Sequence, residues 1–217
     1  MTMQGQLDAV HREISAKVPD LAEKFDADTA EAIRQGLGGE ALTKGARIPD
    51  FELPDQLGRP IRSVDLLAKG PLVISFYRGS WCPYCNVELH ALQQALPEIL
   101  ERGASLVAIS PQIPDASLDT AEKNQLSFPV LSDVGNGVAR QFGLVFVLSE
   151  QLRPLYAQFG IDVPKHDGDD SYELPIPATY IVDRQGTIAA AHVNADYKQR
   201  LEPQRILEIL SPLAQCR

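Results

Sequence analysis

The sequence predicts an α/β domain built on a mixed β-sheet flanked by helices, with a helical extension before it. Short apolar runs alternate with stretches of helical periodicity from Ala46 onward. Residues 72–77 are almost continuously apolar, which is typical of a strand buried on both faces in a parallel sheet. Residues 178–191 surround a turn at residues 183–186 and predict a hairpin. Parallel and antiparallel pairs are therefore expected in one sheet.

The amino-acid composition argues against several classes of protein. The chain has 217 residues, of which 44% are hydrophobic, enough for one full core with a short extension. A net charge of −9 argues against nucleic acid or an anionic membrane as a partner. Three cysteines are too few for a secreted disulfide framework, and no apolar stretch approaches a membrane span. We therefore expect a soluble cytoplasmic protein, in which paired cysteines are more often catalytic than structural.

The first part of the chain reads as two helices. Residues 4–37 show helical periodicity with a break at Pro19, and a glycine-rich join follows. We expect a helical extension at residues 1–44 and one domain at residues 45–217. The apolar stripe of the extension predicts docking, either on the domain or on another subunit. Nothing in it indicates a chemical role.

The remaining elements follow in order. A short hairpin is expected around residues 49–58, before the central strand. Residues 148–174 are polar and read as an irregular loop near a site mouth, or as solvated surface. Beyond these, helical or strand patterns occur at residues 83–103 (helix), 105–109 (strand), 114–126 (helix), 128–131 (strand), 136–142 (helix) and 203–213 (helix).

The motif Cys82-Pro83-Tyr84-Cys85 lies where the buried central strand passes into a helix. Pro83 suits the first helical position, because its missing N–H costs nothing there. Cys82 then lies at or next to the N-cap, where free N–H groups and the helix dipole favour a thiolate, and Arg78 could add a positive charge nearby. Cys85 follows one turn later, within reach of a disulfide. The motif predicts a redox site with Cys82 as the low-pKa thiol.

Two alternatives to a redox site exist for these cysteines. The cysteines would be inert if they were small core residues, or would be half of a zinc site. A zinc site lacks a second Cys-x-x-C, and neither His90 nor Cys216 has a spacing that supplies the missing ligands. Redox chemistry is therefore favoured, with no metal or organic cofactor required. Cys216 is interpreted as a spare thiol, with a resolving role in a neighbouring subunit left as an alternative.

Four stretches carry a family resemblance. They are residues 76–85, residues 48–53, residues 108–110 and residues 128–133. With them the chain resembles the peroxiredoxin-like branch of the alkyl hydroperoxide reductase/thiol-specific antioxidant family, in the thioredoxin superfamily, from about Gly45 to the C-terminus. The resemblance implies a thioredoxin fold and a thiol-dependent peroxidase that reduces hydrogen peroxide or organic hydroperoxides.

The resemblance also assigns roles by position. Cys82 takes the place of the peroxidatic cysteine, and Cys85 that of the second thioredoxin cysteine, which would resolve it. A dithiol reductant such as thioredoxin would then restore both thiols. Pro177 resembles the cis-proline that faces the disulfide in thioredoxins, with the backbone of Ile176 exposed to an extended substrate. A homodimer is left open.

The roles of other residues near the motif are less clearly indicated by the sequence. Trp81 and Tyr84 could shape a substrate groove, or simply pack beside the site. Ser75 and Gly79 stand where peroxiredoxins have a proline and a threonine, and no late arginine aligns. Arg78 is the expected substitute, so a slower peroxidase is predicted. The alternatives are a protein disulfide oxidoreductase and a redox-sensing binding module.

Overall fold

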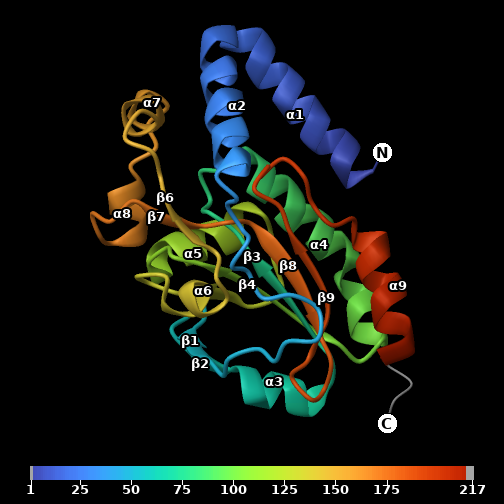
Figure 1. The fold of residues 1–217 in the computed structure, drawn as a ribbon. Helices are drawn as coiled ribbons and strands as arrows, with labels where there is room; N and C mark the ends of the chain where they lie inside the picture. Colours follow the sequence, from blue (N-terminus) through green and yellow to red (C-terminus); the bar gives the residue numbers. More distant parts are fainter. Residues whose placement is uncertain (1, 214–217) are drawn as a thin grey trace.

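The computed structural model describes residues 2–213, which contain a five-stranded mixed sheet with helices on both faces (Figure 1). The strand order is β5-β4-β3-β8-β9. Strands β3, β4 and β5 are parallel, whereas β8 is antiparallel to β3 and β9 to β8. Their bounds are β3 Leu72–Phe76, β4 Ser105–Ser110, β5 Val130–Ser132, β8 Ala178–Val182 and β9 Ile188–Val193. The predicted mixed sheet and its terminal hairpin are confirmed.

Central strand β3 contributes to a core on each side of the sheet. Its five residues are all buried, and successive side chains point to opposite faces. Val73 packs with α4 (Pro83–Glu101) and α9 (Pro203–Leu213), while Ile74 and Phe76 pack with α3 (Ser63–Lys69) and α6 (Gly137–Gln141). Helix α5 (Pro114–Lys123) contributes Ala121 to the α4 side. Burial on both faces explains why β3 is apolar almost throughout.

Two small hairpins lie beside the main sheet. Strands β1 (Glu52–Pro54) and β2 (Pro60–Arg62) form the expected first hairpin. Strands β6 (Val145–Val147) and β7 (Glu173–Pro175) form another, which brackets residues 148–172. That segment was expected to be irregular, but it contains α7 (Arg153–Gln158) and α8 (Val163–Asp167) around a small apolar cluster. The expectation was wrong because both helices are short and lie in a polar segment, and the proline in the first turn of each is equally typical of a loop.

The two N-terminal helices dock on the domain. Helices α1 (Met3–Lys17) and α2 (Pro19–Arg34) form a helical hairpin, with α1 against α4 (Figure 1). The carboxylate of Glu202 accepts the backbone N–H groups of Met3 and Gln4 at 3.2 and 2.8 Å. Lys198 binds Asp26 in α2 at 3.0 Å. Of the two docking modes left open above, the structure has the one on the domain.

None of the helices in residues 2–213 is both long and apolar enough to cross a membrane.

Candidate active site

The two motif cysteines lie at the start of α4. Cys82 is the N-cap residue, Pro83 is the first helical residue, and the Cys82 sulfur accepts the Cys85 N–H at 3.3 Å. A sulfur at this position satisfies a backbone donor that the helix itself leaves free. Both cysteines are fully buried free thiols in this structure. The placement matches the strand-to-helix position that the motif predicted.

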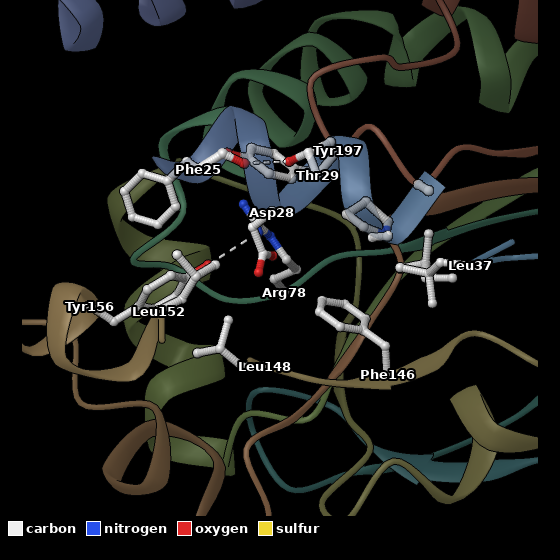
Figure 2. Close-up of a pocket in the computed structure, with 14 residues that line it drawn as sticks. Phe25, Asp28, Thr29, Leu37, Arg78, Phe146, Leu148, Leu152, Tyr156 and Tyr197 are labelled. Carbon is white, nitrogen blue, oxygen red and sulfur yellow. Dashed lines mark hydrogen bonds between the residues drawn. The ribbon is translucent and has the colours of Figure 1, made fainter. Parts of the chain in front are cut away.

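Arg78 is aimed at the Cys82 sulfur. Its Nη2 lies 3.2 Å from Cys82 Sγ, and its Nη1 donates to Tyr156 Oη at 3.3 Å, the bond drawn in Figure 2. The guanidinium lies over the ring of Tyr197 at 4.0 Å and near that of Trp81 at 5.5 Å. Aromatic faces attract a planar cation, so these rings hold the charge next to the sulfur.

The two thiols have opposite electrostatic environments. Burial alone would raise the pKa of Cys82, but hydrogen bonding from Cys85 and the charges of Arg78 and Arg200 bring that pKa well below the usual value for a thiol. The pKa of Cys85 is raised well above the usual value, first by burial and then by its hydrogen bond with Cys82 and the charge of Cys82. The electrostatic environment therefore favours the thiolate form at Cys82 over that at Cys85.

A buried ion pair lies on the other side of Cys85. Arg200, in the loop between β9 and α9, places Nη2 3.9 Å from Cys85 Sγ and Nε 3.4 Å from Glu88 Oε2. The other oxygen of Glu88 accepts Thr179 Oγ1 at 3.2 Å. Burial raises the pKa of Glu88, while Arg200 and Thr179 oppose that rise. A second arginine thus lies within the site, although none aligned with the late arginine of the family.

Sequence reasoning missed both partners of this pair. Glu88 had a detectable signal, because a carboxylate between Cys85 and Leu89 interrupts the buried face of a helix. Arg200 had none, since it lies in a loop and reaches the site only through the tertiary fold.

Trp81 and Tyr84 line a cavity of about 450 Å³ that also borders Cys82 and Arg78. Its outer wall comes from α1 and α2 through His11, Ile14, Ala22, Phe25 and Asp26. His11 has partners that the sequence did not reveal, Tyr84 Oη at 3.3 Å and Asp26 Oδ2 at 3.5 Å. The extension therefore forms part of the wall of the cavity beside Cys82.

Pro177 does not have the expected geometry. No cis peptide bond occurs in residues 2–213, so the Ile176–Pro177 bond is trans and the cis prediction was wrong. Ile176 is buried, and its N–H donates to Leu144 O at 2.8 Å, so it offers no free backbone edge to a peptide. Ile176 and Pro177 form the two-residue link between β7 and β8.

The two link residues border a separate small space. With Arg78, Tyr156 and Tyr197 they line a cavity of about 30 Å³, enough for one or two water molecules. Figure 2 shows the Arg78 side chain between Tyr156, Asp28 and Phe146 in this space.

The structure explains why Gly79 stands where peroxiredoxins have a threonine. A Cβ atom on Gly79 would lie 2.3 Å from Trp81 Nε1, so a threonine there would require Trp81 to move. Trp81 and a threonine at this position therefore exclude each other in the present geometry.

The two remaining sequence candidates are Cys216 and His90. Cys216 lies beyond the described residues. His90 is on the exposed side of α4, where its ring contacts Gln94 at 3.1 Å. Residues 2–213 hold no group of three or more His, Cys, Asp or Glu side chains suited to a metal ion.

Comparisons with known proteins identify the family of this chain. A sequence profile described as the AhpC/TSA family matches residues 44–191. A putative peroxiredoxin of Mycobacterium tuberculosis is 38% identical over 114 residues, covering 52% of this chain and 74% of that protein. Peroxiredoxin Bcp of Escherichia coli is 34% identical over 103 residues, covering 48% and 65% respectively.

The fold agrees as well. The crystal structure of peroxidoxin BcpB from Mycobacterium tuberculosis superposes with a TM-score of 0.62 at 26% identity, covering 79% of this chain and 98% of that one. With the profile spanning most of the chain, the resemblance seen in the motifs is confirmed. The chain belongs to the AhpC/TSA family, the peroxiredoxins of the thioredoxin superfamily, and is an enzyme of the thiol peroxidase type.

Proposed function

We propose that this enzyme reduces hydroperoxides through Cys82, with Cys85 as the resolving thiol and a thioredoxin-like dithiol as the reductant. The observation that carries the proposal is the pair of donors on one sulfur. The Nη2 of Arg78 lies 3.2 Å from Cys82 Sγ, and the N–H of Cys85 lies 3.3 Å from it. Both stabilise a thiolate, the form that attacks a peroxide.

The first step oxidises Cys82. The thiolate attacks the terminal oxygen of a hydroperoxide, so an S–O bond forms as the O–O bond breaks. The sulfur loses two electrons, and the departing oxygen takes up a proton and leaves as alcohol or water. Arg78 supports this step because its guanidinium can stabilise both the thiolate and the negative charge that develops on the leaving oxygen.

The second step forms a disulfide. The Cys85 sulfur attacks the sulfenic sulfur of Cys82, displacing hydroxide, which leaves as water with the Cys85 proton. The two residues lie one helical turn apart and already share a hydrogen bond, which brings the sulfurs together. A dithiol then reduces the disulfide by exchange and is itself oxidised. The homodimer stays a prediction, to be checked by light scattering.

Rapid mixing of the reduced protein with hydrogen peroxide tests the proposal. We expect Cys82→Ser to abolish the fast oxidation. Cys85→Ser should still oxidise once and retain a sulfenic acid that a cyclic diketone traps. Oxidised wild type should run as a monomer on a non-reducing denaturing gel and give a Cys82–Cys85 linked peptide by mass spectrometry. A dimer linked through Cys216 would remove Cys85 from the resolving role.

The disulfide oxidoreductase alternative predicts the reverse behaviour. A protein that ignores peroxides yet rapidly reduces insulin disulfides would overturn the peroxidase proposal. The buried, hydrogen-bonded Ile176 does not favour this alternative, since an extended protein substrate would need a free backbone edge there. Slow turnover with every dithiol tested would instead indicate a redox-sensing module.

A further inference from the structure

The cavity beside Cys82 is much larger than hydrogen peroxide requires. Its volume is about 450 Å³, within the range of roughly 300–1,000 Å³ that is usual for small-molecule sites. A single water needs about 10–15 Å³ of such space. Hydrogen peroxide has only one oxygen atom more than water. Cys82 is fully buried and borders this cavity, so a peroxide that enters it can approach the sulfur.

The walls of the cavity are mainly apolar and aromatic. Phe25 packs against two other aromatic residues of this surface, with its ring 5.7 Å from that of Tyr156 and 6.4 Å from that of Phe159. Trp81 extends it, 5.3 Å from Tyr156 in an edge-to-face arrangement. Such a surface gains binding energy only from a ligand with an apolar body, because hydrogen peroxide has no carbon to bury.

The outer wall comes from residues outside the family match. Ile14, Ala22 and Phe25 belong to α1 and α2, whereas the matched region begins at residue 44. The polar contacts of Asp26 with Lys198 and of Asp28 with Ser149 hold these helices over the site. The extension is therefore placed to act on the substrate rather than on the cysteines.

We propose that helices α1 and α2 make this enzyme selective for bulky, apolar organic hydroperoxides, with Ala22 and Phe25 setting the size and shape of the group accepted. The inference rests on the proposed peroxidase function of Cys82. The organic group lies against the aromatic wall, and its terminal peroxide oxygen points at the Cys82 sulfur beside Arg78. Attack then transfers that oxygen to sulfur and releases the organic alcohol, as in the step described above.

The test compares cumene hydroperoxide with hydrogen peroxide on the reduced full-length protein. We expect the second-order rate constant for Cys82 oxidation to be about tenfold higher with cumene hydroperoxide, the size of effect that a few apolar contacts give. Ala22 is buried in the wall, and Ala22→Phe fills the cavity. This variant should lower the ratio of the two rate constants by about tenfold or more.

The matched control is Ala27→Phe, which places the same side chain on an exposed position of the same helix. It should leave the ratio unchanged. If Ala22→Phe fails to fold by circular dichroism, Phe25→Ala provides a second measurement. It removes an aromatic ring from the wall and should also lower the ratio, through a smaller rate constant for cumene hydroperoxide.

The outcomes separate the two proposals. Cys82 that reacts with neither peroxide would defeat the proposed function itself. Cys82-dependent oxidation with no preference for cumene hydroperoxide, or a ratio that the Ala22 and Phe25 variants leave unchanged, would overturn the inference alone. A ratio that Ala27→Phe lowers as much as Ala22→Phe would also overturn it.

Discussion

At the scale of single residues, one guanidinium has two tasks. Arg78 donates to the Cys82 sulfur and to Tyr156, and two aromatic rings hold it in place. It is also 5% exposed, so its charge is screened little by water. Loss of this side chain should therefore affect both the protonation of the sulfur and the stabilisation of the leaving oxygen.

Arg78→Ala should reduce the rate of peroxide reduction by about 100-fold, the usual cost of one donor aimed at developing charge. The variant also removes a charge that lowers the pKa of Cys82. Since only the thiolate reacts, the rate should then need a higher pH to reach its plateau. A stopped-flow pH profile measures both effects. Arg184→Ala, at an exposed arginine in the β8–β9 turn, is the control. An unshifted pH profile in Arg78→Ala would contradict the electrostatic role.

The buried pair Glu88–Arg200 makes a separate prediction at this scale. Both side chains are almost fully buried, so removing one leaves the other charge without its partner. Glu88→Ala should lower the free energy of unfolding by about 3–5 kcal/mol, measured by urea denaturation of the reduced protein. Glu101→Ala, at an exposed carboxylate at the end of the same helix, should change it little. A loss below about 1 kcal/mol for Glu88→Ala would show that Arg200 is compensated elsewhere.

At the scale of elements, two glycines with the same φ angle allow the cost of backbone strain to be measured apart from the cost of a steric clash. Gly143 and Gly160 both have φ +71°, which L side chains rarely adopt. A Cβ on Gly143 would lie 2.2 Å from the carbonyl oxygen of Glu40, whereas nothing lies within 4 Å of one on Gly160. Gly160→Ala should therefore lower the free energy of unfolding by about 1–2 kcal/mol, which is the cost of the left-handed backbone conformation alone.

Gly143→Ala should cost clearly more than Gly160→Ala, because backbone at Glu40 has to move as well. Urea denaturation of the two variants gives the difference directly. Equal losses would mean that the loop carrying Glu40 shifts freely.

Helix α8 carries a buried carboxyl group whose ionisation should destabilise the fold. Burial raises the pKa of Asp167 to about 8, with a smaller contribution from the charge of Asp169. Neither oxygen of Asp167 has a hydrogen-bond partner. Because the folded pKa exceeds the unfolded one, stability should be greatest below about pH 4 with respect to this group and fall as the pH rises to about 8.

Asp167→Asn should therefore be more stable than wild type at pH 9, and the difference should shrink towards pH 4. Thermal melting across this range checks it, with Asp170→Asn at an exposed neighbour as the control. A stability difference that does not change with pH would assign the effect to packing instead.

The elements differ in how much the sequence could reveal. Strand β3 and helix α4 were predictable because each has a long, regular apolar pattern. Helices α7 and α8 are short, lie in a polar segment and have a proline in the first turn, a pattern that a loop shows equally well. The position of Cys82 followed from local rules at a helix start. Arg200 and the wall formed by α1 and α2 depend on long-range packing, which no local pattern encodes.

The error at Pro177 has the same origin. Its position resembled that of a cis-proline, but its peptide bond is trans, and it follows the β6–β7 hairpin, which the sequence did not predict. The neighbouring Ile176 N–H donates a hydrogen bond to the carbonyl oxygen of Leu144, just before β6. The surroundings of Pro177 could therefore not be predicted without first predicting the β6–β7 hairpin.

At the scale of the whole molecule, the extension is held by a carboxylate distant in sequence. Glu202 accepts two backbone N–H groups at the start of α1, where the helix dipole also favours a negative charge. Glu202→Gln should weaken this docking by about 1 kcal/mol. Amide hydrogen exchange in α1 should then speed up by about fivefold, while exchange in β3 stays unchanged. Equal acceleration in both elements would mean that Glu202 supports the whole fold rather than the extension.

Trp81 gives the molecule an optical reporter. It is the only tryptophan in the sequence, next to the motif cysteines and beside the Arg78 guanidinium and the Tyr156 ring. Oxidation of Cys82 removes the negative charge that Arg78 faces, so the electric field around the indole changes. Emission from unlabelled protein should therefore follow each turnover in real time, and each half-reaction can be timed without a coupled assay.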